Sequence, residues 1–251
     1  MCVTASSGLL DGEGPAKGYC SVECTSDETI CDSFDTSPVC VSFENGKAYC
    51  FEGCDFGPTT LTSFSPNKCH GREEVACRPF YDDQGVFSVP GCFPQCNSDA
   101  DCGGLKCNPK TGLCGATTPT GKAIGEACTQ TPDPCRGACI QLTGPSSKTT
   151  YMCMEGCTAG ATASCGWSGP GTPAPAACLF APTTVIENGG TGFGDLGSCA
   201  PMCNCNADCK NTALSCLGWT GANASALEQY YGKKGYCGFP DTGDVTLPTC
   251  N

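Results

Sequence analysis

Hydrophobic positions in this chain come in short groups separated by Gly, Pro, Asn and Ser, so the expected secondary structure is short. Residues 39–43 and 48–51 are β-prone and flank the tetrapeptide Glu44-Asn45-Gly46-Lys47. Because Asn-Gly supplies the positive φ that a tight turn requires, this segment predicts a β-hairpin.

The clearest helix covers Ala226 to Tyr231. Asn223 or Ser225 can cap it, Ser225 and Glu228 have the spacing of a capping box, and Gly232 can end it in the left-handed conformation. No apolar run reaches the length needed to span a bilayer. We therefore expect a mostly irregular chain with short β-hairpins, one or two short helices and no transmembrane segment.

The 28 cysteines among 251 residues have spacings that repeat. The motif Cys-Phe-Glu-Gly-Cys at 50–54 matches Cys-Met-Glu-Gly-Cys at 153–157, and Cys-x3-Cys-x5-Cys recurs near the end of each run. The pattern predicts a tandem duplication with two related lobes. The first run is Cys24, Cys31, Cys40, Cys50, Cys54, Cys69, Cys77, Cys92, Cys96, Cys102, Cys107 and Cys114. The second is Cys128, Cys135, Cys139, Cys153, Cys157, Cys165, Cys178, Cys199, Cys203, Cys209, Cys216 and Cys237.

Cysteine content changes how the composition is interpreted. Sparse aliphatic residues and a net charge of -12 would by themselves favour disorder. One disulfide that closes a loop of about fifteen residues contributes roughly 3 kcal/mol, so many of them can substitute for a large core. We therefore predict a small disulfide-rich fold.

An even and regularly spaced set of cysteines is typical of exported proteins. The chain begins Met1-Cys2-Val3, without the basic and apolar regions of a secretory signal, so we expect a mature form with a start methionine added. The expected location is extracellular or at the cell surface.

The chain divides into an acidic lead-in at 1–19, a first lobe at 20–116, a linker at 117–120 and a second lobe at 121–251. Removing the twelve matched cysteine pairs leaves two cysteines in each half. We predict that Cys2 bonds Cys20, that Cys205 bonds Cys250, and that no disulfide joins the two lobes.

Cys2 has a second interpretation. A cysteine followed by a small polar tether is how a bacterial lipoprotein begins after signal cleavage, and lipidation would attach the protein to a membrane. Lipidation would also leave an odd number of thiols, so we favour the disulfide.

Catalytic chemistry finds little support in the residue types. His70 is the one histidine, which excludes zinc sites with two histidines, and we expect it on an exposed loop. Adjacent carboxylates at 73–74 and 82–83 are interpreted as solvated surface. With 13 basic and 25 acidic residues and no basic stripe, nucleic acid is not an expected partner. We predict a protein that is not an enzyme and holds no cofactor.

Metal binding is the alternative. Thiolate storage proteins are rich in Cys-x-Cys, which occurs here once, at Cys203 and Cys205. Calcium has weak candidate ligands at alternate positions, although Gly is missing at the sixth position of each loop and a bidentate Glu at the twelfth. Turns capped by Asn and Asp are the preferred interpretation. The calcium candidates are Asn97, Asp99, Asp101, Asn204, Asn206 and Asp208.

Segments 96–102, 125–139 and 151–165 resemble the cysteine-rich repeats of secreted and surface proteins of myxobacteria and related predatory bacteria. The resemblance concerns architecture. It implies an outer-surface protein, often a lipoprotein, in a group that includes cell-surface recognition receptors, and it carries over no catalytic residue.

These observations predict an exported, non-enzymatic structural or adhesive protein that presents loops to a protein, a glycan or a second copy. Duplicated repeats also favour assembly into an oligomer or filament. The alternatives are a secreted inhibitor or toxin-like effector, and a protein that binds metal through thiolates or as a calcium site.

Overall fold

The computed structural model describes residues 1–33, 38–54, 68–81, 87–161, 163–180 and 196–250. The chain forms two compact units. Unit 1 comprises Met1–Pro119, Gly156–Ala161 and Phe180–Gly197, and unit 2 comprises Thr120–Glu155, Thr162–Leu179 and Ser198–Asn251. Their first boundary falls inside the segment 117–120 that was expected as a linker.

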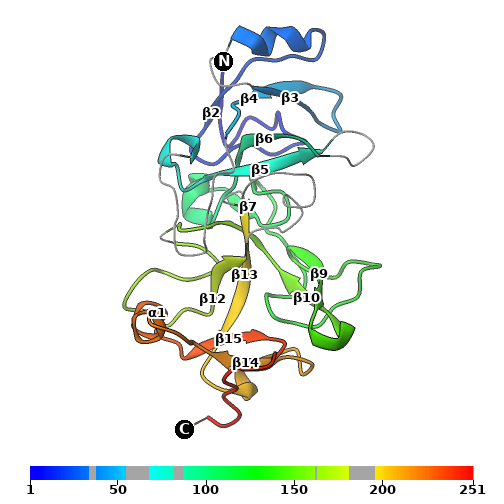
Figure 1. Ribbon diagram of the computed structural model, residues 1–251. Helices are drawn as coiled ribbons and strands as arrows, with labels where there is room; N and C mark the ends of the chain where they lie inside the picture. Colours follow the sequence, from blue (N-terminus) through cyan, green and yellow to red (C-terminus); the bar gives the residue numbers. More distant parts are fainter. Residues whose placement is uncertain (34–37, 55–67, 82–86, 162, 181–195, 251) are drawn as a thin grey trace. The chain divides into compact units, whose positions relative to one another are not determined.

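Unit 1 consists of short antiparallel strand pairs and 3-10 turns (Figure 1). β1 pairs with β2, β3 with β4, β5 with β6, and β7 with β8. The strands are β1 (Cys2–Val3), β2 (Tyr19–Cys20), β3 (Val39–Ser42), β4 (Ala48–Phe51), β5 (Val75–Tyr81), β6 (Phe87–Pro94), β7 (Lys106–Asn108), β8 (Leu113–Gly115) and β11 (Gly156–Thr158). The 3-10 turns are η1 (Glu28–Ser33), η2 (Lys68–Gly71) and η3 (Asp99–Cys102).

In unit 2, β9 pairs with β10, while β12, β13, β15 and β14 neighbour one another in that order in a sheet. The strands are β9 (Ala138–Thr143), β10 (Thr149–Met154), β12 (Ala176–Phe180), β13 (Leu196–Cys203), β14 (Ser215–Gly218) and β15 (Gly235–Gly238). The helical elements are η4 (Pro145–Ser147), η6 (Asn206–Asp208) and α1 (Ala224–Tyr231). Among the described residues, no helix is both long enough and apolar enough to cross a membrane.

The predicted fold class is confirmed. The expected hairpin is present as β3 and β4, with Gly46 at φ 78° in its turn. The expected helix begins two residues earlier than predicted, at Ala224, whose N–H donates to the Gly221 carbonyl. Of the two predicted caps, Asn223 occupies the N-cap position, without a side-chain capping hydrogen bond, and Ser225 lies inside α1. Gly232 ends α1 in the left-handed conformation, as expected.

Most of the disulfides follow one rule, from which Cys205–Cys250 departs. The cysteines of the two runs form groups of four, which we call modules, and within a module the first bonds the third and the second bonds the fourth. The first module shows the pattern with Cys24–Cys40 and Cys31–Cys50. Three others are complete in the same way within the described residues: they are Cys54–Cys77 with Cys69–Cys92, Cys96–Cys107 with Cys102–Cys114, and Cys128–Cys139 with Cys135–Cys153.

The last two modules extend the rule. Cys203–Cys216 and Cys209–Cys237 complete the sixth module. In the fifth, Cys165 bonds Cys199, and Cys157 and Cys178 are also disulfide-bonded. For Cys165, Cys199 and the cysteines of the other five modules, matching positions in the two runs have matching partners. The duplication itself stays a prediction.

Module geometry explains why the rule recurs. In five hairpins the third and fourth cysteines lie directly opposite each other on neighbouring strands, as Cys40 and Cys50 do on β3 and β4. Each of the two bonds backwards to an earlier cysteine rather than across the hairpin. The hairpin is thereby tied at both strands to the segment that precedes it. The other opposed pairs are Cys77 and Cys92, Cys107 and Cys114, Cys139 and Cys153, and Cys216 and Cys237.

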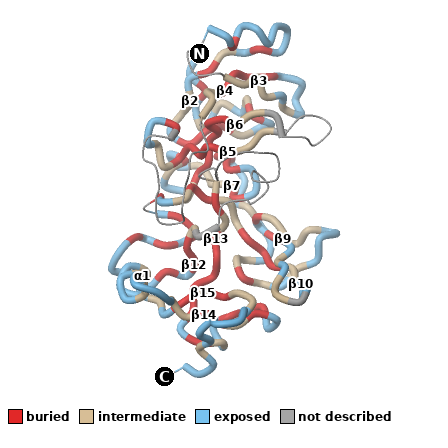
Figure 2. The backbone as a smooth tube through the Cα atoms, viewed as in Figure 1, coloured by how far each residue is buried: buried red, intermediate tan, exposed pale blue. Residues whose placement is uncertain are grey.

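Unit 1 also has an aromatic core. The rings of Phe51 and Phe93 lie 4.9 Å apart and those of Tyr19 and Phe51 lie 5.2 Å apart. Val3 and Leu10 of the expected lead-in are buried beside them, each 2% exposed. Figure 2 shows this buried interior along β4, β5 and β6, and shows α1 largely exposed. Burial of such side chains contributes roughly 1.5–3 kcal/mol each, in addition to the cross-links.

Candidate functional site

A cavity of about 460 Å³ opens in unit 1. Its size falls within the range of small-molecule sites. Side chains from β2, β4, η2, β5 and β6 surround it, and we call it the unit 1 cavity. Its lining residues are Tyr19, Cys20, Cys50, Phe51, Glu52, Cys69, His70, Arg72, Val75 and Cys92.

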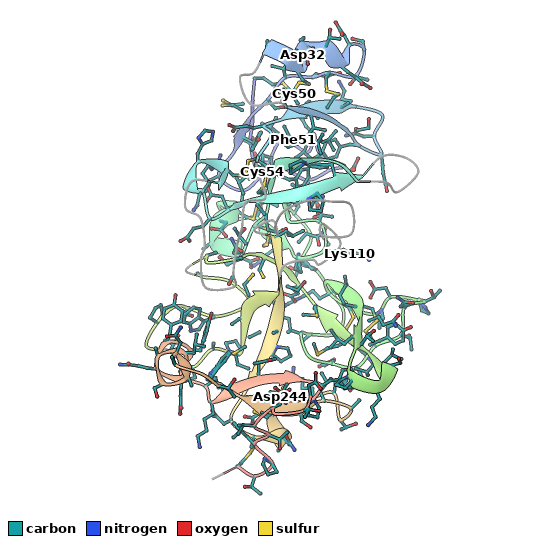
Figure 3. The ribbon with its side chains drawn as sticks, viewed as in Figure 1. Asp32, Cys50, Phe51, Cys54, Lys110 and Asp244 are labelled. Carbon is teal, nitrogen blue, oxygen red and sulfur yellow. A yellow bond between two sulfur atoms is a disulfide. The ribbon has the colours of Figure 1, made fainter. Side chains whose placement is uncertain are left out.

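Disulfides hold the walls of the cavity in place. Cys69 of η2 bonds Cys92 of β6, and Cys50 of β4 bonds Cys31. Figure 3 shows Cys50 and its neighbour Phe51 as adjacent side chains of β4. Because both the η2 and β4 sides are cross-linked to neighbouring segments, the cavity is formed before any ligand arrives.

Tyr19 connects two walls. Its hydroxyl donates to the Cys92 carbonyl at 3.0 Å and accepts the Glu52 backbone N–H at 3.1 Å. Burial raises the pKa of this phenol to about 12. Tyr19 therefore stays protonated across the physiological range and acts as a fixed hydrogen-bonding strut.

His70 stands at the rim in an unusual backbone conformation. Cys69 and His70 have φ of 46° and 60°, a left-handed region that costs side-chain-bearing residues roughly 1–2 kcal/mol each. The imidazole Nε2 lies 2.8 Å and 2.7 Å from the two carboxylate oxygens of Glu52. Strain of this kind, held by a disulfide, is a feature that clusters at functional sites.

Arg72 uses its guanidinium to bind neighbouring groups of unit 1. Its guanidinium donates to the Gly18 carbonyl at 2.9 Å and to a carboxylate oxygen of Glu74 at 3.0 Å. Burial alone would raise the pKa of Glu74, but a backbone N–H and the Arg72 guanidinium outweigh it and lower that pKa. Glu74 is 6% exposed, so the prediction that residues 73–74 form a solvated surface pair is wrong for Glu74.

Cys20 contributes an exposed thiol. Its Sγ lies 2.9 Å from Sγ of Cys2, and these two cysteines are free in the structure. The hydrogen bond with Cys2 raises the pKa of the Cys20 thiol. A nucleophilic cysteine needs the opposite change, so this thiol is not activated for covalent catalysis. His70, as expected, is exposed, and its imidazole pairs with the Glu52 carboxylate rather than with a nucleophile.

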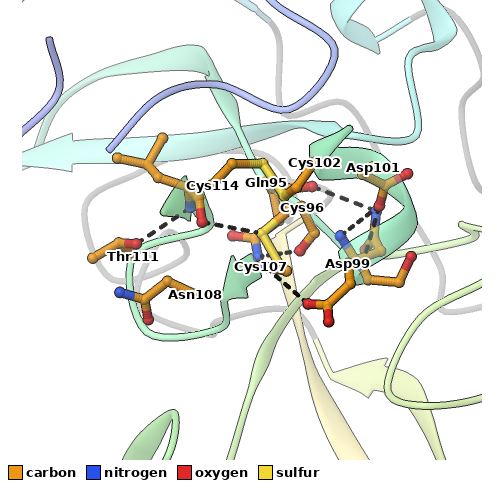
Figure 4. The surroundings of a disulfide bond; sticks show 12 residues. Gln95, Cys96, Asp99, Asp101, Cys102, Cys107, Asn108, Thr111 and Cys114 are labelled. Carbon is orange, nitrogen blue, oxygen red and sulfur yellow. Dashed lines mark hydrogen bonds between the residues drawn. A yellow bond between two sulfur atoms is a disulfide. The ribbon is translucent and has the colours of Figure 1, made fainter. Parts of the chain in front are cut away.

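The predicted calcium ligands of the first lobe have other partners (Figure 4). Asp101 Oδ2 accepts the backbone N–H groups of Asn97 and Ser98 at 2.9 Å and 3.1 Å. Asp99 accepts the Cys107 N–H at 3.0 Å and pairs with Lys106 at 2.7 Å.

The second lobe repeats the arrangement. Asp208 Oδ2 accepts the Asn204 N–H at 2.7 Å, as Asp101 does from Asn97. The side-chain oxygen of Asn204 accepts the Lys234 N–H at 3.1 Å, and that of Asn206 accepts the Cys216 N–H at 2.8 Å. Turn formation thus accounts for these residue types without an ion.

The predicted disulfide candidates have different outcomes in the structure. Cys205 bonds Cys250, which is the predicted pairing. Cys2 and Cys20 are opposed on β1 and β2 but carry free thiols. Each of the twelve disulfides described above, Cys205–Cys250 included, lies within residues 24–114 or within 128–250.

The sequence singled out His70 but not its partner Glu52 or the Tyr19 strut. These residues are separated by 18 and 33 positions in the contacts described above, so no local spacing relates them. Asp82 and Asp83 lie outside the described residues.

Searches of protein-family models, curated proteins and solved structures return no match for this chain. The architectural resemblance to myxobacterial cysteine-rich repeats therefore stays a prediction.

Proposed function

We propose that this protein is an exported, non-enzymatic adhesive protein that binds a neutral glycan in the unit 1 cavity. The observation that carries the proposal is a cavity whose walls are cross-linked in advance by Cys69–Cys92 and Cys31–Cys50. A preformed cavity lowers the ordering cost that a ligand must overcome. The many disulfides suit an oxidising, extracellular environment.

The chemistry of the lining suits a sugar. Phe51 and Val75 line the cavity from the buried core, and Tyr19, which is half-buried, offers part of its ring to the C–H face of a pyranose. The Glu52 carboxylate and the His70 imidazole provide an acceptor and a donor at the rim for hydroxyl groups. A net charge of -12 disfavours acidic glycans, which is why we specify a neutral one.

Binding is favoured over catalysis by the state of the polar groups. The Cys20 thiol has a raised pKa, and Arg72 is already bonded to Glu74 and Gly18. Recognition requires only fixed donors and acceptors, which the Glu52 carboxylate and the His70 imidazole at the rim supply.

A glycan array probed with labelled, non-reduced protein tests the proposal. Glu52→Gln removes one charge and weakens the hydrogen bonds of the rim, so we expect about a tenfold loss of affinity for the glycans that bind. Glu28→Gln is the matched control, because Glu28 is exposed on η1 and its substitution removes the same charge. The proposal fails if no neutral glycan binds, or if the two variants lose affinity equally.

The other predictions of function have their own measurements. A protease-inhibition panel tests the inhibitor alternative, and elemental analysis of the purified protein tests metal binding. Sedimentation with and without calcium tests self-assembly, which a strict monomer at high concentration would reject.

A further inference from the structure

Cys2 and Cys20 stand outside the rule that governs the modules. Each opposed cysteine in the five hairpins bonds away from its neighbour, and Cys205 and Cys250 bond each other. Cys2 and Cys20 are also opposed across a strand pair, yet they carry free thiols. Within the described part of the chain, they are the one opposed pair in which both cysteines are exposed.

The local geometry favours a bond between them. Met1 and Ser21 exchange both backbone hydrogen bonds, at 2.9 Å and 2.7 Å, so Cys2 and Cys20 occupy the adjacent non-hydrogen-bonded position. At such positions of an antiparallel pair the side chains are closest. The two Sγ atoms lie 2.9 Å apart, so little movement separates the dithiol from the disulfide.

We propose that Cys2 and Cys20 form a thiol–disulfide exchange site that reacts reversibly with small-molecule disulfides. In the first step the Cys2 thiolate attacks one sulfur of RSSR, forms a Cys2–S–S–R mixed disulfide and releases RS⁻. In the second step Cys20 loses its proton and attacks the Cys2 sulfur, displacing the second RS⁻. Overall the two protein thiols are oxidised to one disulfide, and RSSR is reduced to two RSH, which take up both protons.

Either thiol can make the first attack, because both sulfurs are exposed and either can donate the hydrogen bond between them. The two steps are the same with Cys2 and Cys20 exchanged.

Because the sulfurs of Cys2 and Cys20 are exposed, small thiols can also reduce the disulfide between them. Solvent reaches both sulfurs, whereas Cys69 and Cys92 of the cavity wall are buried at 6% and 2% exposure. Exposed disulfides are the ones that small thiols reduce first. The β1–β2 ladder has two residues in each strand, so oxidation would clamp a weak strand pair beside the cavity that Cys20 lines.

Thiol mapping on the full chain tests the proposal. A phosphine reductant is added in small steps, free thiols are alkylated, and the labelled cysteines are identified by mass spectrometry. We expect Cys2 and Cys20 to be labelled before any module cysteine. Label that appears on module cysteines at the same reductant concentration overturns the proposal.

Oxidised glutathione then serves as the probe disulfide for the reduced pair. The wild-type protein should lose two hydrogens and retain no adduct, because the second cysteine resolves the first mixed disulfide. Cys2→Ser and Cys20→Ser should each accumulate one glutathione adduct. A stable adduct on the wild-type protein, or a lipid mass on Cys2, contradicts the proposal. The proposal does not depend on glycan binding, so the two can fail separately.

Discussion

Replacing Arg78 by methionine is expected to stabilise unit 1, although it removes a charged side chain from the centre of a strand. Arg78 lies on β5, and its guanidinium carbon stands 4.1 Å from the centre of the Phe93 ring and 5.5 Å from that of Phe80. Burial lowers its pKa to about 10, which leaves it charged at neutral pH. The side chain therefore combines a desolvated charge with a favourable contact to two rings.

Arg78 is half-buried, so solvent reduces both effects. An ordinary arginine pKa lies above 12, and a fall to about 10 corresponds to at most roughly 3 kcal/mol of destabilisation of the charged form. A cation over an aromatic ring recovers about 2 kcal/mol at most. The net cost is about 1 kcal/mol or less. Methionine keeps a long apolar stem against Phe93 without the charge, and such replacements of buried ions are often neutral or stabilising.

Differential scanning calorimetry of the non-reduced chain at pH 7 measures the effect. We expect Arg78→Met to raise Tm by roughly 2–4 °C, the shift that about 1 kcal/mol produces in proteins of 150–250 residues. Arg78→Ala should fall below Arg78→Met by about 1–2 kcal/mol, because it also loses the stem that packs on the rings. Arg136→Met, at an exposed arginine paired with Glu155, is the control for loss of a surface charge.

A lower Tm for Arg78→Met than for the wild-type protein would refute the reasoning. It would mean that the guanidinium stabilises the fold more through its ring contacts than burial costs it. Equal Tm values for Arg78→Met and Arg78→Ala would refute the packing part separately.

Three further predictions concern unit 1. The fold lowers the pKa of Glu74, so its carboxylate stabilises the protein above the unfolded pKa, and this contribution disappears as pH falls through the folded pKa. In Glu74→Gln, the free energy of unfolding from denaturant titration should therefore decrease less steeply with falling pH below about pH 4.3 than in the wild-type protein. Tyr19→Phe leaves one carbonyl and one N–H without the hydroxyl partner and should cost about 1–3 kcal/mol, measured in the same titration at pH 7. Asp101→Ala should lower the free energy of unfolding by about 1 kcal/mol, because the cap of the turn is lost. Calcium should leave the Tm of the wild-type protein unchanged. A rise of Tm with calcium that Asp101→Ala abolishes would instead indicate a bound ion.

Short-range features were predictable from the sequence. Asn45-Gly46 specified the β3–β4 turn through the one residue type that adopts positive φ freely, and Gly232 specified the end of α1. The cysteine spacing predicted a duplication, and the described cysteine pairing is compatible with it. Each of these features depends on neighbours within a few residues.

Contacts over longer distances were not predictable. Spacing does not determine which cysteines pair, since even four cysteines allow three connectivities. Glu74 is acidic and adjacent to another acid, which suggested surface exposure, but Arg72 and the backbone stabilise it in a buried position. The cavity likewise depends on Tyr19 and Glu52 meeting across 33 residues, and only the folded chain brings them together.

Interleaved bonds within each module have a consequence for proteolysis. A single cut between the first and second, second and third, or third and fourth cysteines leaves the two pieces joined by at least one disulfide, as Cys24–Cys40 and Cys31–Cys50 illustrate. Successive modules in each half are separated by three residues, such as 51–53 and 93–95, whereas the thirteen residues 115–127 separate Cys114 from Cys128. An extracellular protease that nicks the modules would therefore leave the protein in one covalent piece, and a cut within 115–127 is the one expected to divide it into its two halves.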